Sequence, residues 1–227
     1  MADQVGMKAM HMFTTGDPSR NPTFVYFADP DYFISDFPAS TCESCINPLF
    51  AWNHGDIQKE IGQTWLGMVG PGVKRKGLSF EWTDHVDVRP TMLAVLGLND
   101  SYLHDGRVII DALNSSALPP VLRNHALTLT LLGDVYKQIN APFGAFSLTA
   151  VAASTKALAS GSDSDDTMYD TLEDKIATLT AERDNLALRM KTMLDGALNG
   201  HSISVQQANQ MIAQGVSLLV RIKILAH

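Results

Sequence analysis

Basic side chains are scarce in this sequence. Its 227 residues include 17 Lys and Arg against 24 Asp and Glu, which gives a formal net charge of -7. The one basic cluster, Lys74-Arg75-Lys76, is short. Affinity for nucleic acid depends largely on clustered Lys and Arg that neutralise phosphates. The composition therefore argues against a nucleic-acid-binding protein, and we expect no nucleic-acid partner.

Long apolar runs are also missing. No stretch is long and apolar enough to span a bilayer, so we expect no membrane span. Residues 1–12 lack a positively charged start followed by an apolar run, and we expect neither a signal peptide nor an N-terminal anchor on this chain. Hydrophobic residues still make up 45% of the sequence and charged residues only 18%, which favours a globular protein with a buried core.

Cysteine occurs only as Cys42 and Cys45, a C-x-x-C pair in a stretch rich in Pro, Ser and Asn. Such a pair can form a tight disulfide, contribute half of a metal site or remain as two free thiols. A structural zinc site is the weakest of these because there is no second pair. Pro48 leaves no room for the long helix of a thioredoxin-type motif. A local disulfide is the favoured interpretation.

Apolar runs and turn residues predict an α/β structure in the first half of the chain. Residues 23–28 and 63–69 predict buried strands, the second closed by a Gly-Pro-Gly turn. Residues 90–98 predict a helix that begins with proline and ends at Gly97. We expect its buried face to be formed by Met92, Leu93, Val95 and Leu96. Strands alternating with such helices indicate α/β layers.

Helical patterns replace the strand patterns after residue 113. Residues 121–140 and 148–159 predict helices, so residues 114–160 are expected to form a helical connection. Residues 161–166 (GSDSDD) then predict an acidic linker.

Two further helices are predicted at the end of the chain. Leu, Ile and Met recur there at steps of three and four, the spacing of a coiled coil, and only Arg183 interrupts the pattern. Asn199-Gly200 ends the first helix, and Ser204 with Gln207 can cap the second. Residues 167–227 are therefore expected to form an antiparallel helical hairpin.

The most informative motifs lie between residues 50 and 110. In order they are FAWNHGDIQKEIGQTWLGMVGPGVKRKG, WTDHVDVRPTMLAVLGL and HDGRVI. This stretch resembles the end of the catalytic domain in nucleotide pyrophosphatase/phosphodiesterases and, more distantly, in sulfatases and other alkaline phosphatase relatives. In that family a His-Gly pair, a Gly-Pro-rich turn and a V-D-x-x-P-T-x-L-x-x-x-G-L helix follow one another. Here the same order and spacing are met by His54-Gly55, Gly70-Pro71-Gly72 and residues 86–98.

The resemblance covers residues 23–113 and implies both a fold and an activity. Residues 1–113 would be the C-terminal portion of an alkaline-phosphatase-like α/β sandwich, a partial catalytic domain, followed by an all-helical extension. The implied activity is hydrolysis of phosphate mono- or diesters, with a small phosphate ester as substrate and a pair of zinc ions as cofactor. Such enzymes commonly work outside the cytoplasm, so the resemblance implies an extracytoplasmic parent protein. In that compartment Cys42 and Cys45 are expected to form a disulfide.

His54 is the metal ligand that the resemblance implies. The imidazole of the family's His-Gly pair completes one site of the metal pair, and Gly55 would let the backbone come close to metal and substrate. A lone histidine in a polar loop is otherwise more often a hydrogen-bonded surface or core residue. The downstream motifs in register favour the ligand interpretation.

The match to the family is incomplete. The family's Thr or Ser nucleophile and its Asp and Asp-His metal ligands precede the matched stretch, and none of these motifs occurs before His54 in this chain. A binuclear site needs several converging carboxylates and imidazoles. We therefore expect a fragment of a zinc-dependent hydrolase that is inactive alone and contributes no catalytic residue of its own. The alternative is a non-catalytic interaction module whose C-terminal hairpin binds a partner or a second copy.

Other polar residues invite a functional interpretation but fit a structural one better. Asp84-His85 lies after the His-Gly pair, whereas the family's Asp-His ligands lie before it, so we expect Asp84 or Asp87 to cap the following helix. Asp29 and Asp31 follow a predicted strand, where functional groups often lie, but a turn beside proline is the favoured interpretation. His104-Asp105-Gly106 is likewise expected to be a turn that the glycine allows.

Overall fold

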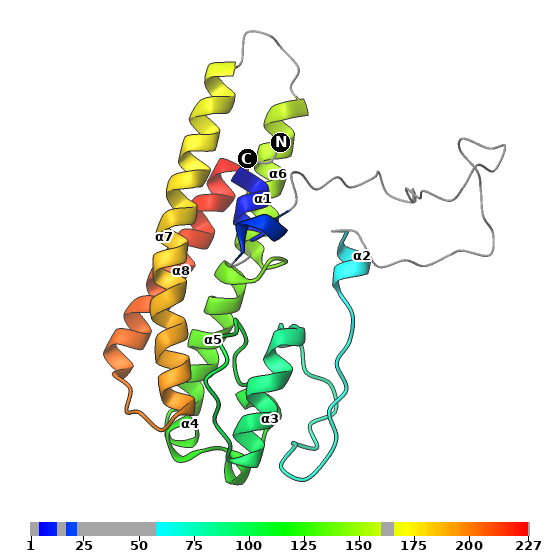
Figure 1. Ribbon diagram of the computed structural model, residues 1–227, viewed down its shortest axis with the longest axis vertical. Coiled ribbons are helices and arrows are strands. Elements are labelled where there is room, and N and C mark those ends of the chain that lie inside the picture. Colours follow the sequence, from blue (N-terminus) through cyan, green and yellow to red (C-terminus); the bar gives the residue numbers. More distant parts are fainter. Residues whose placement is uncertain (1–4, 13–16, 22–57, 160–165, 227) are drawn as a thin grey trace, which may run out of the picture.

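The computed structural model describes residues 5–12, 17–21, 58–159 and 166–226. Within these ranges the chain is helical (Figure 1), and the bridge between Val73 and Leu113 is the sole β-type pairing. The predicted α/β sandwich is therefore wrong for the part of the chain that the structure describes.

The predicted strand at residues 63–69 shows why the α/β expectation fails. These residues have no regular hydrogen-bonded partner, and the side chains of Trp65 and Val69 are 88% and 99% exposed. Aromatic and β-branched residues favour a strand only where a neighbouring strand pairs with them and their side chains pack on a surface. The other predicted strand, residues 23–28, lies outside the described residues.

The described ranges contain α-helices and short 3-10 turns. The α-helices are α1 (Val5–Ala9), α2 (Lys59–Gly62), α3 (Val88–Leu96), α4 (Pro120–Asn124), α5 (Ala126–Asn140), α6 (Ala145–Ala159), α7 (Asp166–Leu198) and α8 (Val205–Leu225). The 3-10 turns are η1 (Pro18–Arg20), η2 (His85–Asp87), η3 (Ile110–Ala112) and η4 (Ser115–Ala117). Among these helices, none combines the length and the apolar character needed to cross a membrane.

The core lies among α5, α6, α7 and α8, and α1 packs against α6 and α7 (Figure 1). Each long helix contributes a row of buried side chains at three- and four-residue steps, the period that keeps one face of a helix turned inward. The central members of these rows are Leu129, Leu132, Tyr136 and Ile139 in α5, Phe146, Ala150 and Ala153 in α6, Ile176, Leu179, Leu186 and Met190 in α7, and Ala208, Met211, Leu218 and Ile222 in α8.

Helices α5 and α8 approach each other closely at Gly215. A Cβ atom placed on Gly215 would lie 2.3 Å from Cγ1 of Val135, so any larger residue would push the two helices apart. Glycine in a helix interior is normally unfavourable. At this position the missing side chain is what allows α5 and α8 to come into contact.

Arg183 occupies a core position of α7, where the apolar spacing in the sequence is interrupted. Its side chain is fully buried, and Nη1 donates to the carbonyl oxygens of Ala9 (3.0 Å) and Ile139 (3.1 Å). Its guanidinium carbon lies 5.2 Å from the centre of the Phe146 ring. Both carbonyls belong to the last turns of helices, where orphan acceptors carry partial negative charge. The arginine therefore ties the ends of α1 and α5 to α7.

Residues 199–204 connect α7 to α8, which run side by side in opposite directions (Figure 1). Gly200 adopts a φ of 83°, a conformation that favours glycine. The Ser204 side chain accepts a hydrogen bond from the Gln207 N–H at 3.3 Å, which confirms the predicted cap of α8. Arg221 and Glu182 join the two helices by a paired contact, with Nη2 2.9 Å from Oε1.

Helix α3 confirms the predicted end at Gly97, but it begins at Val88, two residues before the predicted start, and it does not bury the predicted face. It ends at Gly97, which has a left-handed φ of 65°. The expected buried side chains of Met92, Val95 and Leu96 are exposed instead. The helix buries its other side, formed by Pro90, Thr91 and Ala94.

Candidate functional site

The residues with the strongest functional expectation are not covered by the structure. His54, the expected zinc ligand, lies outside the described residues, as do Asp29, Asp31, Cys42 and Cys45. The roles of these residues therefore stay predictions. The motif residues from 82 to 110 are described, and they form a connected polar cluster between α3 and α5.

Asp84 and Asp87 form a reciprocal cap. The backbone N–H of Asp84 donates to Oδ2 of Asp87 at 3.1 Å, and the two residues enclose the η2 turn that leads into α3. The expected cap of α3 is not formed: the two residues cap η2, and α3 begins without a side-chain cap. His85, between the two aspartates, points to the surface. This geometry supports the rejection of Asp84-His85 as a metal-binding pair.

The Asp87 carboxylate is fully buried and fully engaged. Oδ1 accepts the backbone N–H of Arg107 at 2.8 Å and lies 3.2 Å from Nζ of Lys137. Nζ of Lys137 also lies 2.9 Å from both carboxylate oxygens of Asp84 and 5.8 Å from the centre of the Trp82 ring. Burial raises the pKa of Asp84 above its ordinary value, and the Lys137 charge acts in the opposite direction. A buried carboxylate is tolerable only with such partners.

Thr91 is a second anchor within the same motif. Its Oγ1 donates to the Asp87 carbonyl at 2.7 Å and accepts the Ile109 N–H at 3.0 Å. The Asp and Thr of the V-D-x-x-P-T motif therefore both hold residues 107–109 against the start of α3. In this structure the motif serves to position backbone.

The segment His104-Asp105-Gly106 forms a turn, as expected. Nδ1 of His104 accepts the Gly106 N–H at 3.1 Å. Burial lowers the pKa of His104, and the nearby Lys191 charge adds to this. The glycine is required for space: a Cβ on Gly106 would lie only 1.9 Å from the carbonyl oxygen of Val86.

Arg107 extends the cluster toward α5. Its Nη2 lies 2.6 Å from Oδ1 of Asp134 and donates to the carbonyl of Trp82 at 3.2 Å. Burial raises the pKa of Asp134 to about 6, although the Arg107 charge opposes this shift. The sequence motifs do not indicate that Arg107, Asp134 and Lys137 belong to the cluster. The only available signal was the presence of charged residues inside otherwise apolar helical and extended stretches.

Apolar side chains of the same region are exposed. Beyond Trp65 and Val69, Phe80 is 91% and Leu103 92% exposed. Single exposed apolar residues are common on soluble proteins, whereas contiguous patches of large ones are a feature of interaction sites. The apolar set comprises Trp65, Leu66, Val69, Leu78, Phe80, Val86, Met92, Val95, Leu96, Leu98, Tyr102 and Leu103. All of these residues fall within the stretch that resembles the hydrolases.

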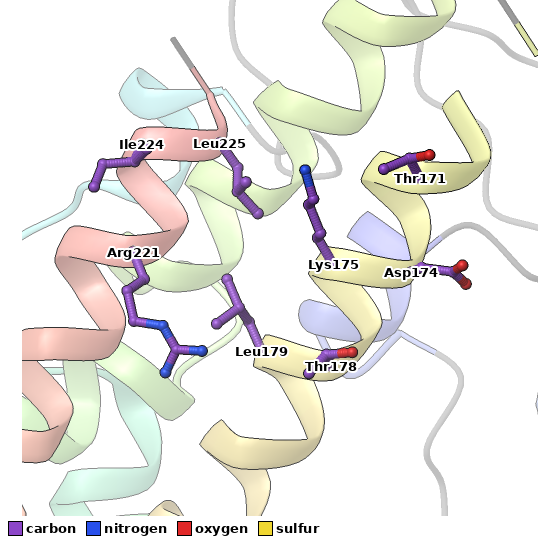
Figure 2. A pocket seen from close by; sticks show the side chains of 8 residues that line it. All are labelled: Thr171, Asp174, Lys175, Thr178, Leu179, Arg221, Ile224 and Leu225. Carbon is purple, nitrogen blue, oxygen red and sulfur yellow. The ribbon is translucent and has the colours of Figure 1, made fainter. Parts of the chain in front are cut away.

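An open groove of about 460 Å³ separates part of α7 from the end of α8 (Figure 2). Leu179 and Leu225 point into it, and Lys175 extends along it. Arg221, at its edge, is held by Glu182. The groove lining combines apolar side chains with polar and charged ones: Leu179, Ile224 and Leu225 with Thr171, Asp174, Lys175, Thr178 and Arg221.

The described residues contain no group of three or more His, Cys, Asp or Glu side chains placed to hold a metal ion. Comparison with known proteins gives no match: no family model, curated protein or solved structure is similar to this chain. The resemblance to phosphate-ester hydrolases therefore depends on the sequence motifs.

Proposed function

We propose that this chain is one part of a zinc-dependent phosphate-ester hydrolase, of the phosphodiesterase or phosphatase type, and that it is inactive without the remainder of the catalytic site. The observation that carries the proposal is the coincidence of the apolar set with the motif-bearing stretch. Residues that resemble the end of a catalytic domain display large apolar side chains, as expected of a surface that the rest of that domain covers.

The polar cluster supports the same proposal. Asp87, Thr91 and Arg107 hold the stretch firmly on the helices through buried contacts. The backbone of residues 87–109, which carries the part of the apolar set on and after α3, is therefore anchored on one side and displays these side chains on the other. A scaffold of this kind preorganises a binding surface and reduces the ordering cost of association.

His54 is the proposed contribution of this chain to the metal site. A neutral imidazole suits zinc, but one ligand cannot hold the ion. The described residues offer no group that would complete the site. We therefore derive no step of the reaction through zinc and assign the remaining ligands and the nucleophile to the complementary part of the enzyme.

Two measurements test the proposal. The purified chain should show no turnover of a nitrophenyl phosphate or its diester above background; zinc-dependent turnover that His54→Ala abolishes would contradict inactivity. In the complete enzyme, His54→Ala should lower both activity and zinc occupancy, because one ligand of one ion is lost. Unchanged metal content and rate in that variant would remove His54 from the site.

A second candidate function is a non-catalytic interaction module built on α7 and α8. The observation that favours it is a stripe on α8 at four-residue spacing, in which Val216, Val220 and Ile224 are 47%, 54% and 67% exposed. If the module binds a partner through this stripe, Val220→Asp should abolish the association without changing the helical circular dichroism. A complex that survives the substitution would rule the stripe out.

A further inference from the structure

The outward side of α8 is unusually apolar for the surface of a helical protein. Three exposed aliphatic residues of its second half, Val216, Val220 and Ile224, repeat every four positions, whereas a surface helix normally places polar residues there. Ile224 also lines the groove between α7 and α8, next to Leu225 and Leu179 (Figure 2). The stripe and the groove are therefore continuous, and we refer to them together as the α8 face.

We propose that the α8 face is the interface between two copies of this chain. This inference rests on the second candidate function and names its partner. It is independent of the apolar set, which belongs to residues 65–103.

Charge complementarity within the chain indicates a second copy. Arg221 and Lys223 are the only charged residues of α8, and both are cationic. On α7, Asp174 is exposed and lines the groove, whereas Glu173 accepts a hydrogen bond from the Tyr169 hydroxyl. Lys223 forms no ion pair with the described residues, so its charge is available to another molecule. A surface with both signs is complementary to itself, as a two-fold contact requires.

The opposite directions of α7 and α8 allow this pairing. A two-fold axis parallel to the helices would place the C-terminal half of α8 beside the N-terminal half of α7 from the second copy. The same contact would occur twice. Helix α8 is about 30 Å long and about 10 Å wide, and it would pair with a similar length of α7. The faces of α7 and α8 from both copies would together bury about 1,200 Å², the lower end of stable interfaces.

The first experiment measures the mass of the full chain by size-exclusion chromatography with light scattering, from about 1 to about 100 µM. The chain should be a dimer at the upper end of this range, and Val220→Asp should make it a monomer with unchanged circular dichroism. The matched control is Phe80→Asp, which places the same charge on a side chain that is 91% exposed outside the α8 face. A monomeric wild-type chain overturns the proposal, as does a dimer that Phe80→Asp disrupts and Val220→Asp does not.

A charge exchange tests the arrangement of the two copies. Lys223→Glu and Asp174→Lys should each weaken association by about threefold to tenfold, because each replaces an attraction by a repulsion. The double variant should regain most of the loss. If the double variant associates no better than either single variant, the proposed pairing of α8 with α7 is wrong.

Cysteine labelling separates failure of the second-copy proposal from failure of the interaction-module function. In a chain with Cys42→Ser and Cys45→Ser, Val220→Cys should react slowly with a maleimide at concentrations where the chain is dimeric and quickly on dilution. A monomer with fast labelling would overturn the second copy but leave the face free for another partner. A monomer with slow labelling would show that the α8 face is covered within the chain. The second-copy proposal and the interaction-module function would then both be wrong.

Discussion

Lys137 is the residue whose replacement should damage the polar cluster most. Its side chain is buried, and its Nζ is the cation closest to both Asp84 and Asp87. The variant Lys137→Met keeps most of the side-chain volume and removes the charge. Two carboxylates, one of them fully buried, would then lie together without their shared cation.

The expected cost follows from this geometry. Breaking a buried ion pair by removing one partner destabilises a protein by about 3–5 kcal/mol, because the remaining charge is buried without compensation. For a chain of this size, such a loss lowers the melting temperature by about 10 °C. The loss should shrink as the pH falls, since burial raises the pKa of Asp84 and protonation of that carboxyl group removes its repulsion of Asp87.

Urea and thermal unfolding followed by circular dichroism would measure this effect, with Lys175→Met as the matched control. Lys175 is exposed and forms no ion pair with the described residues, so its replacement should change stability by less than about 0.5 kcal/mol. If Lys137→Met and Lys175→Met unfolded at the same denaturant concentration, the claim that the cluster holds α3 on α5 would be wrong.

Three further predictions concern single positions. Gly106→Ala should cost more than about 2 kcal/mol, because its Cβ would overlap the Val86 carbonyl; a melting temperature equal to that of the wild type would refute the close approach. Burial raises the pKa of Asp134 to about 6. The protonated carboxyl group therefore contributes fully to stability below pH about 4, and this contribution is lost as the pH rises through about 6. In Asp134→Asn, the free energy of unfolding should vary less with pH across this interval. Burial lowers the pKa of His11, with a neighbouring arginine adding to the effect, so the neutral ring favours the folded state and stability is lost as the pH falls below about 6.5. In His11→Gln this acid-side loss should be smaller, as measured by urea unfolding at pH about 5 and about 7.5.

Local signals predicted the ends of several elements. Gly97 ends α3 in a left-handed conformation, and Ser204 caps α8 through the Gln207 N–H. These features depend on one or two neighbouring residues. They hold whatever the rest of the chain does, because glycine tolerates positive φ and a serine oxygen reaches the nearby N–H groups.

Contacts distant in sequence were not predictable in the same way. The stretch at residues 63–69 has strand-like composition, yet no neighbouring strand is described beside it. The buried side of α3 is the opposite of the expected one, because Asp87 and Thr91 bind residues 107–109 and turn that side inward. No periodicity in the helix itself carries this information.

The candidate site was likewise predictable only in part. Sequence motifs alone point to His54 and to a phosphate-ester hydrolase, and both stay proposals. The motifs also pointed to Asp84 or Asp87 as a cap of α3, whereas in the structure the two residues cap η2. They did not reveal that Lys137 and Arg107 complete the cluster, since these residues lie 50 and 20 positions beyond Asp87.

By itself, the sequence determined the helical character of its second half and the local signals that end α3 at Gly97 and cap α8 at Ser204. Only the tertiary structure decided that Arg183 interrupts the apolar spacing of α7 because it binds two helix ends, and that Gly215 is needed where α8 meets α5. The physical reason is the distance along the chain over which each effect acts. Propensity and capping act over three or four residues, whereas burial, ion pairing and close packing depend on partners that only the folded chain brings together.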